Sequence, residues 1–229
     1  MAIRLVVFDV AGTTWDDRGV VRTALHDAIA AVGPDLKPAA IAGVLGLAKP
    51  MAIRVLLEGH GREDLFPRIP EIMAAFTAQL TEHIARAPCV QPIAGISAMF
   101  GELRAANVRI ALGSGLSRQV LDVLLERLGW AGPDSPVDAA VASDEVQRGR
   151  PWPDMIERLR EQLGGVDPGD VAKVGDTPVD LQEGTVARCG MVIGVCTGGH
   201  SREELAHHPH DAILDSAADV ASLVAARAR

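Results

Sequence analysis

The sequence predicts an α/β protein: a Rossmann-like, doubly wound parallel sheet with a helical cap inserted after the first strand. Two patterns support this fold class. Short apolar runs alternate with segments of helical periodicity, which is typical of parallel strands joined by crossover helices. The stretch 16–88 breaks the alternation, because it carries helical patterns alone. We therefore expect an α/β core domain of residues 1–15 and 89–229 and a helical cap domain of residues 16–88.

The first strand is expected at residues 3–10, whose letters IRLVVFDV form an apolar run typical of a buried strand. Apolar residues at helical spacing then predict cap helices at residues 23–30, 50–57 and 69–85. Later apolar runs predict strands at residues 108–112, 139–141, 171–174 and 191–195. Helical segments follow these strands, at residues 117–128, 153–162, 178–187 and 217–226.

The composition excludes several classes of partner. With 48% hydrophobic and 23% charged residues, the chain resembles an ordinary globular protein. A net charge of −8 and the lack of any Lys/Arg-rich block argue against nucleic acid or an anionic membrane as partner. No apolar run approaches the roughly 20 residues of a membrane span. Three cysteines without CxxC spacing, Cys89, Cys189 and Cys196, predict reduced thiols and a cytoplasmic protein.

Asp9 ends the first apolar run and is followed at once by the turn residues 11–14, AGTT. Such a strand delivers its carboxylate to the carboxyl edge of a parallel sheet, where ligands bind in open α/β proteins. The alternative is an aspartate that only caps the turn. Polar groups at three later strand ends favour the chemical role.

Two of these strand ends carry groups suited to a phosphoryl anion. Ser114 lies between two glycines, so its hydroxyl can donate a hydrogen bond while Gly115 lets backbone N–H groups approach an anion. Arg150 brings a fixed positive charge ahead of the next helix, where it can neutralise a phosphoryl group. The alternatives are a plain helix N-cap for Ser114 and a solvated side chain for Arg150.

Asp176 and Asp180 follow the strand expected at residues 171–174, and Asp180 falls on the first turn of a helix. Two carboxylates that face one cleft supply oxygen ligands for a hard cation. The alternative is helix capping and a favourable contact with the helix dipole. Because Asp9 adds a third carboxylate at a comparable strand end, the pattern favours a metal site.

The order of these groups resembles the haloacid dehalogenase superfamily over essentially the whole chain. Its members form covalent aspartyl intermediates, mostly with phosphoryl groups and Mg²⁺. The resemblance implies that Asp9 attacks phosphorus while Mg²⁺ and Arg150 neutralise charge. It also implies Mg²⁺ ligation by Asp9, Asp176 and the carbonyl of Ala11, with Asp180 acting directly or through water. The implied phosphoryl-binding set is Ala11, Gly12, Thr13, Ser114, Gly115 and Arg150.

Ala11 narrows the resemblance to one branch. Most phosphatases of this superfamily carry an aspartate at this position as general acid, and its loss costs ester hydrolysis roughly 10²–10⁴-fold. The phosphonoacetaldehyde hydrolases, or phosphonatases, carry alanine there. Residues 9–14, DVAGTT, resemble their first motif, and residues 114–118, 149–151 and 175–177 resemble later ones.

Phosphonatases also use a cap lysine, which forms a Schiff base with the aldehyde of the substrate. Residues 45–49, LGLAK, resemble that segment and place Lys49 three residues after a glycine. An imine requires a lysine amine that is unprotonated near neutral pH, obtained by desolvation or by cationic neighbours. The alternative is that Lys49 grips the far end of an anionic substrate, as Arg or Lys does at this position in related phosphatases.

These observations lead to one principal hypothesis, a Mg²⁺-dependent hydrolase of a small phosphonate, phosphonoacetaldehyde first. A phosphomonoesterase with Lys49 as anion clamp is the second hypothesis. A non-catalytic binder of phosphorylated metabolites and a halide-releasing enzyme are further alternatives. The resemblance also implies a homodimer, because phosphonatases dimerise through their caps. Trp15 is expected either to line the pocket or to pack at the cap hinge. His200 is expected either to reach the cleft or, with Ser201, to help start a helix at Arg202.

Overall fold

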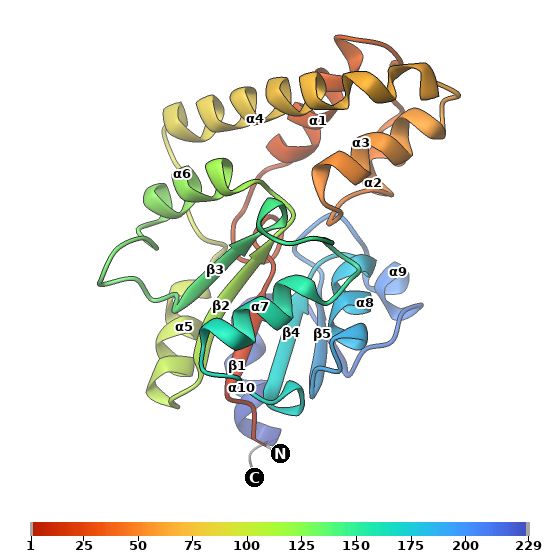
Figure 1. The fold of residues 1–229 in the computed structure, drawn as a ribbon. Helices are drawn as coiled ribbons and strands as arrows, with labels where there is room; N and C mark the ends of the chain where they lie inside the picture. Colours follow the sequence, from red (N-terminus) through yellow and green to blue (C-terminus); the bar gives the residue numbers. More distant parts are fainter. Residues whose placement is uncertain (1, 228–229) are drawn as a thin grey trace.

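The computed structural model describes residues 2–227. Within them, a six-stranded sheet runs in the order β3-β2-β1-β4-β5-β6, and every neighbouring pair is parallel (Figure 1). The fold class predicted from the sequence is therefore confirmed. The strands are β1 (Leu5–Phe8), β2 (Arg109–Ser114), β3 (Ala139–Ala142), β4 (Val171–Gly175), β5 (Met191–Val195) and β6 (Ala212–Leu214).

The register of the three central strands positions the site. Phe8 at the end of β1 lies opposite Leu112 of β2 and Val174 of β4. Since the strands are parallel, the residues just beyond them emerge together at one edge of the sheet. This register brings Asp9, Ser114 and Asp176 to the same edge, although they are far apart in the sequence.

Helices cover both faces of the sheet. Val6 and Phe8 point into a cluster with α5 (Ile96–Ala105), α6 (Arg118–Leu128) and α10 (Val220–Arg227). Leu5 and Val7 point the other way, toward α7 (Asp154–Gln162), and α8 (Pro178–Val186) packs beside it on β4 and β5. Both alternating sets of β1 are fully buried, which explains why the sequence shows a continuous apolar run there. α9 (Arg202–Ala206) packs beside β5 and β6.

The cap consists of α1 (Val20–Ala30), α2 (Pro38–Ala42), α3 (Lys49–Glu58) and α4 (Ile69–Arg86), drawn above the sheet in Figure 1. α4 buries an apolar stripe at four-residue spacing, Ile72, Phe76, Leu80 and Ile84, and packs against α1 and α3. It also contacts α6 of the core. Arg127 of α6 ties the two parts together, because its guanidinium donates to the carbonyls of Ile84 (3.0 Å) and Ala87 (2.6 Å) at the end of α4.

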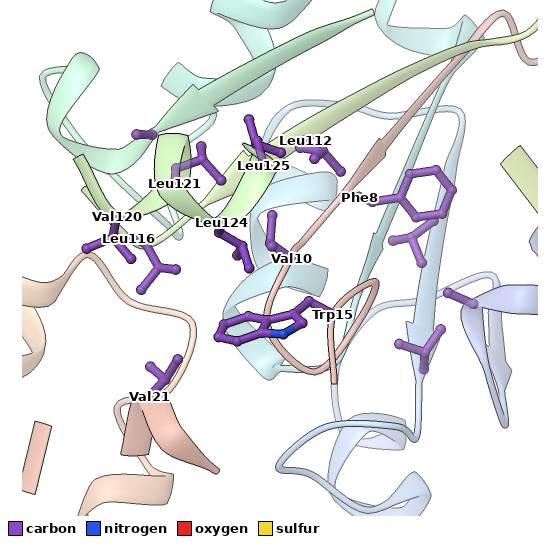
Figure 2. Packing of buried hydrophobic residues seen from close by; sticks show 14 of the residues in the cluster. Phe8, Val10, Trp15, Val21, Leu112, Leu116, Val120, Leu121, Leu124 and Leu125 are labelled. Carbon is purple, nitrogen blue, oxygen red and sulfur yellow. The ribbon is translucent and has the colours of Figure 1, made fainter. Parts of the chain in front are cut away.

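Trp15 marks the place where the two linkers between sheet and cap run side by side. It forms an antiparallel bridge with Pro92, and the Ile93 N–H donates to the Thr14 carbonyl (3.0 Å). Its side chain is buried beneath Val10, in the cluster that includes Leu124 (Figure 2). Of the two roles expected for Trp15, packing at the hinge is therefore the one found. The domain limits at residues 15–16 and 88–89 stay a prediction.

Three elements were not expected from the sequence: α2, α5 and β6. α5 contains Gly101, which weakens a helix by about 1 kcal/mol relative to alanine. Tertiary packing overrides this cost, because α5 buries Ile96, Met99, Phe100 and Leu103. β6 is an edge strand of three residues, too short to give a pattern.

Short 3₁₀ segments complete the chain, at Glu63–Arg68, Ser143–Glu145, Pro168–Asp170 and Ala217–Asp219. None of the helices in residues 2–227 has the length and apolarity to cross a bilayer. Cys89, Cys189 and Cys196 are free thiols.

Candidate active site

Asp9, the expected nucleophile, continues the register of β1. Its backbone N–H donates to the carbonyl of Val174 (2.9 Å), so the residue leaves the sheet at the carboxyl edge beside β4. The following turn closes on the Val10 carbonyl, which accepts from the N–H groups of Thr14 (2.9 Å) and Trp15 (2.8 Å). Asp9 is only 5% exposed but lines a cleft. Burial raises the pKa of the Asp9 carboxyl, and the positive charge of Arg150 opposes the rise.

Asp176 and Asp180 bring two more carboxylates to this point. One oxygen from each of Asp9, Asp176 and Asp180 lies within 4.8 Å of the others, and all three side chains are buried. Asp176 accepts from the Thr13 hydroxyl (2.9 Å) and from the Gly199 N–H (3.2 Å). Burial and the two neighbouring carboxylates raise the pKa of Asp176 well above its usual range. A divalent cation would relieve this repulsion, and buried carboxylate oxygens are the ligands it prefers.

Arg150 lies against these carboxylates with 1% of its side chain exposed. Its Nη2 is 2.7 Å from Asp9 Oδ1, and its Nε is 3.1 Å from Asp180 Oδ1 and 3.0 Å from Glu183 Oε2. Burial works against the charge of Arg150, but the carboxylates outweigh it and raise the pKa above its ordinary value. The solvated alternative considered for Arg150 is thus excluded.

Lys173 and Glu183 belong to the same network, although the sequence alone assigned a role to neither. Lys173 lies on β4, and its Nζ is 2.9 Å from Asp180 Oδ1 and 2.8 Å from Glu183 Oε2. Both side chains are fully buried. The available signal was a charged residue inside an otherwise apolar strand, which is costly unless the charge is paired.

Lys49 opens α3 on the cap side of the same cleft and is 4% exposed. Its Nζ donates to the carbonyl of Leu47 (3.2 Å). Among the described residues, no carboxylate lies within ion-pair distance of it. Burial lowers the pKa of the Lys49 amine to about 8, while the charge of Asp9 acts in the opposite direction.

The loop that precedes α3 docks directly on the core. Gly46 has a φ of 83°, and a Cβ there would lie 2.6 Å from the side chain of Val179. A Cβ on Gly115 would lie 2.9 Å from the carbonyl oxygen of Leu47. A side chain at either glycine would push cap and core apart. The carbonyl of Gly46 also accepts from Arg150 Nη1 (3.3 Å), so the cap loop contacts the charged network itself.

The cleft between cap and core has a volume of about 200 Å³. Most of the expected site residues line it: Asp9, Ala11, Gly12, Lys49, Ser114, Gly115, Arg150 and Asp176. Two expected residues lie beneath its surface instead. Thr13 is fully buried and holds Asp176, and Asp180 is fully buried behind Arg150 and Lys173.

His200 is half-buried and is not among the residues that line the cleft. The helix start expected beside it is present, because the Ser201 hydroxyl accepts from the Glu204 N–H and caps α9. Leu116 is buried and forms part of the cleft wall.

The buried side chains around Asp9 carry more negative than positive formal charges. Four carboxylates, Asp9, Asp176, Asp180 and Glu183, face two cations, Arg150 and Lys173. The excess of negative formal charge in this ion-paired set favours a bound cation. Two residues after Asp9, Ala11 offers only a methyl group, so the cleft has no carboxylic acid at that position to protonate a leaving group.

A parallel sheet with a buried carboxylate cluster at its carboxyl edge, covered by a helical cap, defines an α/β enzyme with an acid-lined cleft. The haloacid dehalogenase-like hydrolase family model matches residues 3–188, and the chain belongs to this family. It is a hydrolase, and its carboxylate cluster fits a divalent metal ion.

Within this family, the chain is similar in sequence to proteins named phosphonoacetaldehyde hydrolase. The chain is 32% identical to the phosphonoacetaldehyde hydrolase of Syntrophobacter fumaroxidans, covering 86% of this chain and 73% of that one. It is 30% identical to that of Bordetella pertussis, covering 87% and 74%. A phosphonoacetaldehyde hydrolase-like protein from Oleispira antarctica has the same fold, with a TM-score of 0.86 at 21% identity, covering 99% of this chain and 92% of that one.

Proposed function

We propose that this chain is a Mg²⁺-dependent hydrolase that cleaves the C–P bond of a small carbonyl-bearing phosphonate, with phosphonoacetaldehyde as the first candidate. The observation that carries the proposal is Lys49, a buried amine without a carboxylate partner among the described residues, on the cleft that Asp9 lines. The curated relatives bear the name of this activity.

Lys49 has the property that imine formation needs. Burial lowers the pKa of its amine to about 8, so a useful fraction is unprotonated near neutral pH. The amine attacks the substrate carbonyl and water leaves, which gives a protonated imine. When the C–P bond breaks, its electron pair moves to carbon and is taken up by the imine as an enamine. Protonation of the enamine at carbon and hydrolysis of the resulting imine release the aldehyde product and restore the Lys49 amine. No acid beside the nucleophile is required, which accounts for Ala11.

Asp9 supplies the other half of the reaction. Its carboxylate attacks phosphorus as the C–P bond breaks, and water then hydrolyses the aspartyl phosphate to release phosphate. Arg150 contacts Asp9 and is placed to neutralise phosphoryl charge. Ser114, with the backbone of Gly12 and Gly115, lines the cleft where phosphoryl oxygens would bind.

Mg²⁺ would be held by Asp9, Asp176 and the carbonyl of Ala11, and it would supply charge neutralisation at the phosphoryl group. Asp180 is expected to act through water, because its oxygens already contact Arg150, Lys173 and Thr177.

Borohydride trapping tests the imine. Reduction in the presence of phosphonoacetaldehyde should inactivate the enzyme and add mass to the peptide that contains Lys49. Lys37 and Lys173 are the other lysines of the sequence and serve as internal controls. Turnover of phosphonoacetaldehyde that survives Lys49→Ala would exclude the mechanism.

A second candidate is a phosphomonoesterase in which Lys49 clamps an anion. It is favoured by one observation: with a pKa of about 8, most of the Lys49 amine is protonated at pH 7. This candidate predicts metal-dependent phosphate release from small phosphate esters and retention of activity in Lys49→Arg. A panel of esters without turnover would dispose of it.

We also propose a homodimer formed through the cap. Met51 and Val55 of α3 are 51% and 41% exposed, and a partner's cap would cover them. Light scattering that gives the 24.1 kDa monomer mass would contradict the dimer.

A further inference from the structure

The three lysines of the sequence are distributed unevenly. Lys37 is exposed on the cap, whereas Lys49 and Lys173 are buried beside the carboxylate cluster. The catalytic proposal uses Lys49 and leaves Lys173, with its partner Glu183, unexplained.

The fold makes room for Lys173. β4 lies between β1 and β5, and central parallel strands normally carry branched apolar residues. A Cβ on Gly184 of α8 would lie 2.9 Å from Lys173 Cβ and 3.0 Å from its Cγ. Any other residue at position 184 would displace the lysine stem. Gly184 therefore leaves the space that the stem of the Lys173 side chain occupies.

Stability alone does not account for the pair. Replacing a complete buried ion pair with apolar residues of similar volume is often neutral or stabilising. Lys173 and Glu183 are both fully buried, so the cost of removing their charges from water is large. The pair is better explained by what it does to its neighbours.

Its neighbours are Arg150 and Asp180. Glu183 Oε2 is shared between Arg150 Nε (3.0 Å) and Lys173 Nζ (2.8 Å), and Asp180 Oδ1 is shared by the same two cations, at 3.1 and 2.9 Å. These contacts hold the Nε edge of the guanidinium. Its Nη2 stays directed at Asp9. Without Lys173, Arg150 alone would have to balance both Asp180 and Glu183.

We propose that Lys173 and Glu183 are a positioning pair, which touches no substrate, fixes Arg150 toward the nucleophile and sets the charge of the metal cluster. The catalytic part of this inference rests on the proposed function, whereas the effect on metal binding does not. The pair should therefore be tested first with Mg²⁺ alone.

Calorimetric titration of the whole protein with Mg²⁺ separates positioning from general damage. Lys173→Met removes a positive charge near the cluster and should lower the Mg²⁺ dissociation constant by about tenfold. Glu183→Gln removes a negative charge and should raise it by about tenfold. Loss of structure would weaken binding in both variants. The exposed Lys37→Met is the matched control and should leave the constant unchanged.

The double variant Lys173→Met with Glu183→Gln restores the net charge and should return Mg²⁺ affinity to within about threefold of wild type. If Lys173→Met does not fold, the Mg²⁺ affinities of Glu183→Gln and of the double variant still test the proposal. Shifts in the same direction, or below twofold in both single variants, would overturn the proposal.

With phosphonoacetaldehyde as substrate, all three variants should lose at least about tenfold in kcat with little change in KM, because the ion-pair network on the Nε edge of Arg150 is altered. A KM effect without a kcat effect would also refute positioning. If wild type turns over no phosphonate, the calorimetry still decides for or against the pair, so the two proposals fail independently.

Discussion

Lys49 on the cap and Lys173 in the core are both buried, yet their surroundings are opposite. Lys173 Nζ is 2.9 Å from an oxygen of Asp180 and 2.8 Å from an oxygen of Glu183. Among the described residues, the Lys49 amine donates a hydrogen bond only to the carbonyl of Leu47. Burial works against both charges. The carboxylates outweigh it at Lys173 and raise its pKa, while burial prevails at Lys49 and lowers its pKa to about 8.

The difference separates two uses of one side chain. A paired lysine stays charged and can organise its neighbours, which suits the core network. An unpaired buried lysine loses its proton readily and can act as a nucleophile, which suits the cap. Variants at Asp9 and at the two lysines test whether the lysines differ in this way.

The largest effect is expected at Asp9, the proposed nucleophile. Asp9→Asn removes the attacking oxygen, so turnover of any phosphonate or phosphate substrate should fall by about 10⁴-fold or more. Phosphate release measures it. Asp134→Asn, a neutralised exposed carboxylate away from the cleft, is the control and should stay near wild type. Residual activity above 1% of wild type, an order-of-magnitude threshold, would contradict nucleophilic catalysis.

Lys49→Arg keeps a positive charge but removes the amine. If Lys49 forms an imine, activity on phosphonoacetaldehyde should fall by about 10³-fold, because a guanidinium does not form a Schiff base. If it only clamps an anion, activity on phosphate esters should stay within about tenfold. Steady-state kinetics on both substrate classes decides between the two mechanisms.

The same substitution at the two lysines should change stability in opposite directions. The pKa of Lys49 is about 8 in the folded protein, below the ordinary 10.5. The charged amine therefore lowers the free energy of unfolding at pH 7. This loss disappears as the pH rises from about 8 to 10.5, because the folded protein releases the proton before the unfolded chain does. Lys49→Met should therefore stabilise the fold by roughly 1–3 kcal/mol. Lys173→Met leaves a buried pair broken and should destabilise it by about 3–5 kcal/mol.

Urea denaturation at pH 7 measures both changes, and the exposed Lys37→Met should fall within about 0.5 kcal/mol of wild type. Two changes of the same sign would show that the two lysines are not differently paired.

The smallest effect is a pH dependence. Only the free amine of Lys49 attacks a carbonyl, so kcat/KM for phosphonoacetaldehyde should rise up to about tenfold per pH unit below pH 8 and level off above it. Stopped assays across pH 6 to 9.5 measure the profile. An anion clamp gives the reverse, a KM that rises as the ammonium loses its proton above pH 8.

Local sequence was sufficient for much of the site. Asp9 and Asp176 stand directly after a strand, Ser114 ends β2, and Arg150 lies in the loop between β3 and α7. The parallel register then brings Asp9, Ser114 and Asp176 to one edge. The local sequence did not predict α5 or β6. Gly101 weakens the helical pattern of α5, and a three-residue edge strand such as β6 is too short to show periodicity.

The alternation of strands and helices along the chain, the helical stretch after the first strand and the position of Asp9 and Ala11 at a strand end are evident from neighbouring residues, because strand periodicity and turn chemistry are short-range properties. Pairings between distant residues are not. Arg150 donates a hydrogen bond to Glu183, which lies 33 positions away in the sequence. Lys49 is buried where the loop at Gly46 packs against the core. Burial and charge pairing arise from packing, so only the tertiary structure decides which of the two buried lysines keeps its proton.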